Sequence, residues 1–130
     1  MRKIYIDFDG TIVEHKFPEI GRPVPHAFEV IKKLSKSRHQ IVMNTFRSDL
    51  GIDFLTDALK YCKENGCEFE YWATNKKEPI AWNLSMASKT NDIFIDDITP
   101  GIPLVPTNNG KGWMVDWEEV ESRLKNHGIL

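Results

Sequence analysis

Apolar positions follow two alternating patterns along the chain. Short runs of apolar and β-branched residues are typical of buried strands, and four such runs lie at residues 3–8, 40–44, 69–73 and 92–95. Residues 113–115 are a candidate fifth strand. Between the runs, apolar residues recur every three or four positions, which is the spacing of one helix face. We therefore expect helices at residues 26–37, 49–65, 79–86 and 117–127.

Turn and capping residues mark the ends of several of these elements. Asp9 and Gly10 end the first apolar run, and Gly66 follows the second expected helix. The prolines and glycine within residues 12–25 predict an ordered loop. Asp116 and Glu119 have the spacing of a capping box, which predicts that the last helix begins between them.

The order of the elements predicts the fold class. Strands that alternate with helices imply parallel strands joined by right-handed crossovers. We therefore expect an α/β fold, a three-layer α/β/α sandwich with a central, mainly parallel sheet of Rossmann-like type. The sequence has no internal repeat or linker-like stretch, and 130 residues suit one compact domain spanning residues 1–130.

Composition and charge exclude several classes of function. Seventeen Lys and Arg residues against nineteen Asp and Glu residues give a net charge of −2, and no basic run is present. This balance argues against a nucleic-acid binder that relies on charge. No apolar run is long enough to span a membrane, and Cys62 and Cys67 are too few for a disulfide framework or a zinc site. We therefore expect a cytoplasmic protein with reduced thiols.

Candidate chemistry lies where the expected strands end. In an open parallel sheet, ligands bind outside the carboxyl ends of the strands. Those ends carry Asp7, Asp9, Gly10 and Thr11; Thr45 and Arg47; Lys76 and Lys77; and Asp96 and Asp97. Asp7 and Asp9 are two positions apart, so in an extended segment their side chains share one face. Four carboxylates at one sheet edge repel one another unless a cation joins them, and their oxygen donors suit Mg²⁺.

The same residues carry a family resemblance. Asp7-Phe8-Asp9-Gly10-Thr11 after an apolar strand resembles the Asp-x-Asp-Gly-Thr motif of the haloacid dehalogenase superfamily. Thr45 after the second strand resembles the second motif of that superfamily, and Asp96-Asp97 resembles its acidic fourth motif. The segments DFDGTIVEHKFPEIGRPVP and IFIDD are similar to a subgroup of small bacterial and phage phosphatases.

The resemblance implies a Mg²⁺-dependent phosphomonoester hydrolase. Asp7 would be the nucleophile that forms an aspartyl-phosphate, and Asp9 would act as general acid and then base. Thr45 and the backbone N–H groups at Gly10 and Thr11 would hold the phosphoryl oxygens. The metal ligands would be the carboxylate of Asp7, the main-chain carbonyl of Asp9, and Asp96 and Asp97.

A lysine should neutralise the phosphate, and three candidates remain open. The resemblance favours Lys89, just ahead of the acidic strand, followed by Lys77 and then Lys76. Arg47 is either a second phosphate contact or a solvated side chain. Ile98 departs from the subgroup, which often has a basic residue directly after the acidic pair, and Thr90 stands where an apolar residue or proline is usual.

Other interpretations of the sequence remain open. Transfer of the phosphoryl group to another hydroxyl fits the same residues, as does a non-hydrolytic phospho-acceptor or binding module on this fold. The acid at Asp9, two positions after Asp7, favours turnover. We expect the histidines to be surface residues and the tryptophans to be packing residues: His15, His26, His39 and His127, and Trp72, Trp82, Trp113 and Trp117. Trp72 could instead border the pocket.

The spacing of the motifs leaves no room for a cap domain. Expected elements fill the chain from Thr11 to Thr45 and from there to Lys89. We therefore expect an open site covered only by residues 12–24, with broad tolerance for substrates. The expected substrates are phosphorylated small molecules or larger phosphoesters, and another subunit could complete the pocket.

Overall fold

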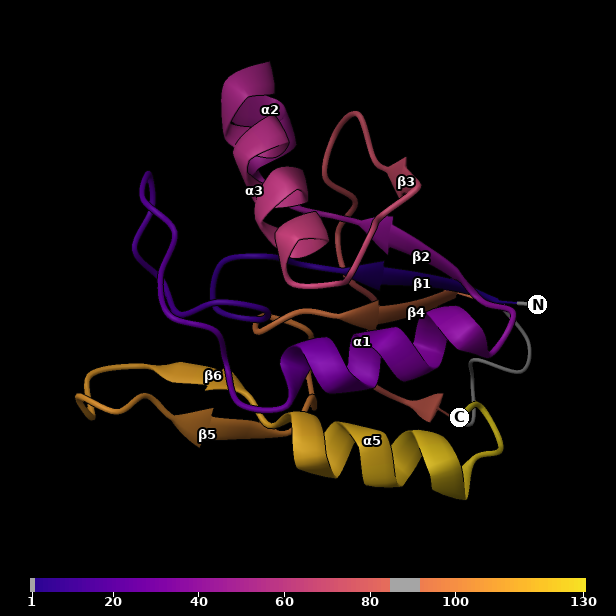
Figure 1. Ribbon diagram of the computed structural model, residues 1–130. Helices are drawn as coiled ribbons and strands as arrows, with labels where there is room; N and C mark the ends of the chain where they lie inside the picture. The colour runs from indigo at the N-terminus through magenta and orange to yellow at the C-terminus, as the bar shows by residue number, and fades with distance from the viewer. Residues whose placement is uncertain (1, 85–91) are drawn as a thin grey trace.

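A four-stranded parallel sheet forms the centre of the protein. The computed structural model describes residues 2–84 and 92–130 (Figure 1). The sheet has the order β3-β2-β1-β4, and its strands are β1 (Lys3–Ile6), β2 (Gln40–Met43), β3 (Tyr71–Trp72) and β4 (Asp92–Ile95). Every pair of neighbours in this sheet is parallel, as the alternation of strands and helices predicts.

The register of the sheet separates two apolar faces. Ile6 lies between Met43 of β2 and Ile95 of β4, and these three side chains belong to the main core. Tyr5, one position earlier, lies between Val42 and Phe94, and these three form a separate buried cluster. Both faces of the central strands are therefore covered, as a near-continuous apolar run requires.

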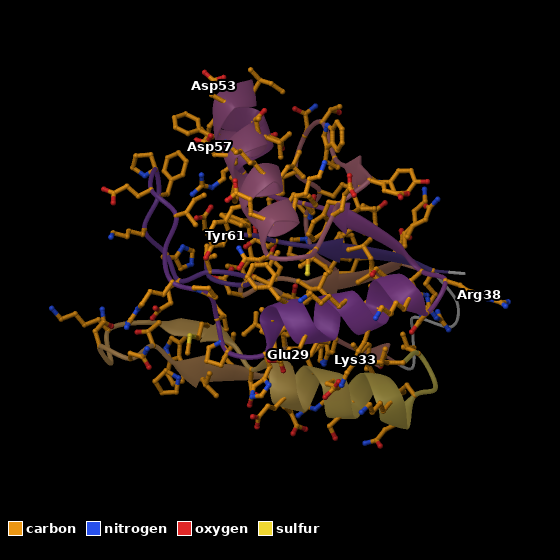
Figure 2. All side chains as sticks on the ribbon, viewed as in Figure 1. Glu29, Lys33, Arg38, Asp53, Asp57 and Tyr61 are labelled. Carbon is orange, nitrogen blue, oxygen red and sulfur yellow. The ribbon has the colours of Figure 1, made fainter. Side chains whose placement is uncertain are left out.

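Helices cover the main-core face. They are α1 (Ala27–Lys36), α3 (Ile52–Glu64) and α5 (Trp117–Asn126), and their buried apolar residues all join the main core. Lys33 lies on α1 (Figure 2), and its Nζ is 2.6 Å from Oε2 of Glu121, which joins α1 to α5. Asp53, Asp57 and Tyr61 follow one another along α3 (Figure 2). The Tyr61 ring meets Phe8 at 6.3 Å between centroids.

The segment after β3 reaches the opposite face of the sheet. Lys77, in this segment, places its Nζ 3.1 Å from the Tyr5 hydroxyl and 4.9 Å from the centre of the Tyr5 ring. The fold is thus the expected α/β fold, with a mainly parallel central sheet flanked by helices.

Several elements differ from the sequence prediction. The expected helix at 49–65 is divided into α2 (Arg47–Leu50) and α3, because Gly51 adopts a φ of 142° that interrupts the helix. The strand β6 (Trp113–Val115) does not extend the parallel sheet but pairs antiparallel with β5 (Leu104–Pro106). Residues 79–83 contain no helix, and most of the rest of the helix predicted at 79–86 lies outside the described residues.

The capping and packing predictions have mixed outcomes. The Asp116 side chain accepts a hydrogen bond from the Glu119 N–H at 3.2 Å, so the N-cap half of the predicted capping box is confirmed. The reciprocal half does not form, because the Asp116 N–H donates to the Pro103 carbonyl and the Glu119 carboxylate accepts from Arg123. Trp117 is buried in the core, but Trp72 is 48% exposed and Trp113 is 60% exposed. The packing prediction is wrong for these two because both lie on short strands at sheet edges. Cys62 and Cys67 are free and buried.

Among the described residues, no helix combines the length and the apolar character that crossing a membrane requires.

Candidate active site

Three carboxylates meet at the carboxyl ends of β1 and β4. Asp7 follows β1, and Asp96 and Asp97 follow β4, the strand paired with β1. A hydrogen bond of 3.0 Å from the Asp7 N–H to the Ile95 carbonyl continues the pairing to this point. Side-chain oxygens of the three aspartates lie within 4.8 Å of one another. We call Asp7, Asp96 and Asp97 the acidic cluster.

Burial makes this cluster electrostatically unfavourable without a cation. Burial and the nearby charge of Asp96 raise the pKa of Asp7 well above its ordinary value. Burial also raises the pKa of Asp96. Asp97 is half-buried, but hydrogen bonds with His15 and Asp96 outweigh the effect of burial and lower its pKa. All three donors are oxygens, the ligand type that Mg²⁺ and Ca²⁺ prefer, so the acidic cluster fits a hard divalent cation.

Lys76 is the cation that the described residues bring to the acidic cluster. Its Nζ lies 3.0 Å from Oδ2 of Asp96 and 4.0 Å from Oδ1 of Asp7, and its side chain is only 5% exposed. The ammonium group also lies 4.1 Å from the centre of the Phe46 ring. The Asp49 side chain fixes the segment by accepting a hydrogen bond from the Lys76 N–H at 3.1 Å.

The choice among the three lysines therefore changes. The prediction that Lys77 faces the phosphate site is wrong, because Lys77 extends to Tyr5 on the other side of the sheet. Asn44 holds its backbone in place, accepting from the Lys77 N–H at 2.8 Å and donating to the Lys77 carbonyl at 3.0 Å. Lys89, the first candidate, and the adjacent Thr90 lie outside the described residues. Lys76, the last candidate from the sequence, is the one of the two described lysines that lies beside Asp7 and Asp96.

The turn after Asp7 orients its carboxylate. The Thr11 hydroxyl donates to Oδ2 of Asp7 at 3.3 Å and accepts from the Asp97 N–H at 3.1 Å, so it links β1 to β4. The indole N–H of Trp117 donates to the Thr11 carbonyl at 2.7 Å. The N–H groups of Gly10 and Thr11 were predicted to bind phosphate, but they donate to the Val13 and Phe8 carbonyls within the turn.

Asp9 is half-buried and forms an ion pair with the buried Arg47. Nε of Arg47 lies 2.8 Å from Oδ2 of Asp9, and Nη2 lies 2.9 Å from Oδ1. The Arg47 side chain is 1% exposed, and its guanidinium lies over the rings of Phe8 and Phe17. The interpretation of Arg47 as a solvated side chain is therefore wrong, whereas a contact between Arg47, which lines the cavity, and a phosphate stays a prediction. The start of α2 brings Arg47 back against β1, and Asp9 reaches it there.

Arg47 also holds the loop that precedes α1. Its Nη2 donates to the Glu19 carbonyl at 2.9 Å, and its Nη1 contacts the Pro18 carbonyl at 3.4 Å. Thr45 is buried beside it, and its hydroxyl oxygen accepts from the Arg47 N–H at 3.2 Å. One residue thus connects the ends of β1 and β2 with the loop.

His15 is the site residue that the sequence analysis missed. Its Nε2 lies 2.7 Å from Oδ2 of Asp97, and this contact raises the pKa of His15. Gly10 permits the approach, because a Cβ at that position would clash with both side chains and the backbone φ of 84° is unfavourable for other residues. The Asp-Gly turn was thus an indirect signal, although no sequence spacing connects His15 with Asp97.

These residues line a common cavity of about 230 Å³. Its polar wall contains Asp7, Asp9, His15, Thr45, Arg47, Lys76 and Asp97, and its apolar wall contains Phe17, Phe46, Leu50 and Ile98. The predicted residues from the ends of β1, β2 and β4 therefore converge on one cavity, as the fold class predicts. The arrangement offers a buried carboxylate, a cation beside it and a space in front of it.

Comparisons with known proteins address the fold. No protein-family model matches the chain, and neither does any curated protein. Among solved structures, the chain is similar to a conserved protein of Bacteroides thetaiotaomicron, with 26% sequence identity and a TM-score of 0.65. That match covers 96% of this chain and 90% of the other, so the likeness extends over almost the whole fold.

Proposed function

We propose that this protein is a Mg²⁺-dependent phosphomonoester hydrolase of the haloacid dehalogenase type. The observation that carries the proposal is the position of Asp7, a buried carboxylate that faces a cavity beside the Lys76 ammonium. A nucleophilic carboxylate with an adjacent cation is what transfer of a phosphoryl group through an aspartyl-phosphate requires. The order of the Asp7, Thr45 and Asp96-Asp97 motifs supports the same assignment.

The proposed reaction has two steps at Asp7. A carboxylate oxygen of Asp7 attacks phosphorus, the bond from phosphorus to the ester oxygen breaks, and the leaving oxygen takes the proton of the Asp9 carboxyl group. Water then attacks the phosphorus of the aspartyl-phosphate and gives a proton to the Asp9 carboxylate, which releases inorganic phosphate, restores the Asp7 carboxylate and returns Asp9 to its protonated form. The hydrogen bond from Thr11 to Oδ2 fixes the orientation of the attacking group.

Lys76 and the acidic cluster supply the electrostatic part. The Lys76 ammonium would offset the negative charge of the phosphoryl oxygens, and this kind of stabilisation dominates phosphoryl transfer. Asp7, Asp96 and Asp97 would hold Mg²⁺, which when bound neutralises phosphate charge. Lys76 and His15 together cannot balance three carboxylates, and this excess of negative charge is the reason to expect a metal here.

Asp9 is the general acid that the resemblance implies, and in the structure it forms an ion pair with Arg47. Because Arg47 contacts both carboxylate oxygens, Arg47 sets the direction in which Asp9 faces the cavity. Arg47 is therefore a positioning residue for the acid. For the setting of this reaction we propose the cytoplasm, where the free thiols of Cys62 and Cys67 would stay reduced.

A phosphate-release assay tests the function. The panel contains sugar phosphates, nucleotides and phosphorylated oligonucleotides, each with Mg²⁺ and with chelator, and the isosteric variant Asp7→Asn is the control. We expect release only with Mg²⁺ and only with Asp7 intact. A phosphorylated protein that never turns over would identify a phospho-acceptor instead, and phosphate recovered on added glycerol would identify a transferase.

A further inference from the structure

Four exposed apolar side chains surround the entrance of the active-site cavity. Phe17, Phe46, Leu50 and Ile98 line the cavity and are between 44% and 56% exposed. They come from three separate parts of the chain: the loop before α1, the segment from the end of β2 through α2, and the turn after Asp97. We call these four residues the apolar rim. Apolar side chains that converge on one concave site indicate a ligand-binding surface.

The two rings of the apolar rim are held in place by the cations of the site. The Arg47 guanidinium lies 5.0 Å from the centre of the Phe17 ring, and Lys76 lies 4.1 Å from that of Phe46. Phe17 also packs on Phe54 of α3, at 5.0 Å between ring centres. The rim is therefore built onto the catalytic groups, and ordered side chains lose little entropy when they bind a ligand.

The basic side chains of the cavity are already paired with carboxylates. Its three basic side chains each lie on a carboxylate: Lys76 on Asp96, Arg47 on Asp9 and His15 on Asp97. Among the described residues that line the cavity, none is therefore a free cation for a second phosphate or a carboxylate. The position after the acidic pair holds Ile98, where the resembling phosphatases often have a basic residue.

We propose that the apolar rim binds the leaving group of the phosphomonoester, and that this group is an uncharged apolar body such as a single ring. The proposal rests on the phosphatase function proposed above and adds the substrate class. A cavity of about 230 Å³ is smaller than the sites that hold drug-sized ligands, which suits a small ester.

A second copy of the chain is a less suitable occupant. Each half-exposed rim side chain offers on the order of 100 Å², so the four together offer roughly 400 Å². A stable protein interface needs about 800 Å² from each partner. The apolar rim is also concave and continuous with Asp7, and therefore suits a ligand that reaches the nucleophile.

The test compares primary-alcohol esters, so that the bond broken is of the same kind throughout. The substrates are benzyl phosphate, cyclohexylmethyl phosphate and glycerol 3-phosphate, and the quantity measured is kcat/KM with Mg²⁺. We expect both apolar esters to exceed glycerol 3-phosphate by about tenfold or more. Benzyl and cyclohexylmethyl phosphate should be similar, because the rim contacts provide burial rather than hydrogen bonds.

Rim variants assign this preference to the proposed residues. Leu50→Ser and Ile98→Ser should each lower the ratio of apolar to polar kcat/KM by about threefold or more. Ile52→Ser is the matched control, because Ile52 is 72% exposed and lies outside the cavity. This control should keep the wild-type ratio.

Three results would overturn the proposal. They are a wild-type ratio near one or in favour of glycerol 3-phosphate, a ratio that the rim variants leave unchanged, and a dimer in sedimentation that Leu50→Ser converts to monomer. If no ester releases phosphate, the proposed hydrolase function is wrong, and calorimetry with two non-hydrolysable phosphonates then tests the apolar rim by itself. Benzylphosphonate should bind more tightly than 2-hydroxyethylphosphonate, and Leu50→Ser should abolish this difference. Equal binding of the two phosphonates to the wild type would overturn the role of the rim.

Discussion

Two carboxylates at the end of β1, only two positions apart, lie in opposite electrostatic situations. Asp7 belongs to the acidic cluster, where Asp7 and Asp96 share the ammonium of Lys76 and Asp97 contacts His15, so three carboxylates meet two basic side chains. Asp9 has its own cation, because Arg47 contacts both of its oxygens and is itself buried. The acidic cluster therefore needs further positive charge, whereas the Asp9–Arg47 pair is complete.

The difference comes from the elements that the two residues meet. Asp7 faces the end of β4, which contributes two more aspartates, whereas Asp9 faces the start of α2, which contributes Arg47. The unbalanced region suits a cation and a phosphate, and the balanced region holds the loop before α1 in place. Chemistry should therefore depend most on the acidic cluster, and stability most on the ion pair.

The largest expected effect is on turnover at Asp7. Asp7→Asn preserves shape and removes the attacking anion, so the rate of phosphate release should fall by about 10⁴-fold or more. The measurement is kcat for a phosphomonoester with saturating Mg²⁺, and circular dichroism verifies that the variant is folded. A rate close to that of the wild type would exclude an aspartyl-phosphate.

Adjacent lysines provide the next test of the acidic cluster. Lys76→Met removes the ammonium beside Asp7 and Asp96, so kcat/KM should fall by about 10²- to 10³-fold. Lys77→Met is the matched control, because that ammonium contacts Tyr5 on the other face of the sheet, and its effect should stay within about twofold. Equal losses in both variants would contradict the role of Lys76.

These two lysines also show what sequence can and cannot predict about the site. Asp7, Asp96 and Asp97 follow recognisable apolar strands, so the parallel fold alone places them at one edge. Lys76 and Lys77 are neighbours in a loop, where no periodicity determines which of them faces the site. That choice depends on the hydrogen bonds of Asn44 to Lys77 and on the ring of Phe46, which are contacts between distant segments.

The Asp9–Arg47 pair escaped prediction for a related reason. The helical pattern at 49–65 does not indicate that Gly51 divides it, nor that the separate turn α2 begins at Arg47. A buried arginine is also uncommon, so the sequence favours an exposed one. The central strands and the helices of the main core depend on short-range apolar patterns, and these were predictable.

Breaking the Asp9–Arg47 pair should reduce stability rather than remove the nucleophile. Arg47→Met leaves Asp9 without its cation and frees the Pro18 and Glu19 carbonyls, which should cost about 3–5 kcal/mol of the free energy of unfolding. Arg123→Met is the control, because Arg123 forms an exposed pair with Glu119 on α5 and should cost less than about 1 kcal/mol. Urea denaturation measures both, and similar small losses would show that the buried pair is unimportant.

The smallest expected effect concerns the stability of the protein without metal. Here a substitution in the acidic cluster should raise stability, whereas Arg47→Met should lower it. Burial and Asp96 raise the pKa of Asp7, so the folded state binds its proton more tightly than the unfolded state does. The free energy of unfolding should therefore fall as the pH rises from 3.8, the ordinary pKa of an aspartate, to the raised pKa of Asp7 in the folded state. Above that pH the loss of stability should stay constant. Asp7→Asn removes it, so the metal-free variant should be more stable than the wild type by about 1 kcal/mol at neutral pH.

Two conditions distinguish this effect from a general change in packing. At acid pH, where Asp7 is protonated in both states, the advantage of Asp7→Asn should disappear. Mg²⁺ at neutral pH should raise the melting temperature of the wild type by a few degrees and that of the variant by less, because the wild-type cluster has more charge to neutralise. If Asp7→Asn were still more stable than the wild type at acid pH, the increase in stability would come from packing. If Mg²⁺ stabilised the wild type and Asp7→Asn equally, the acidic cluster would not be the metal site.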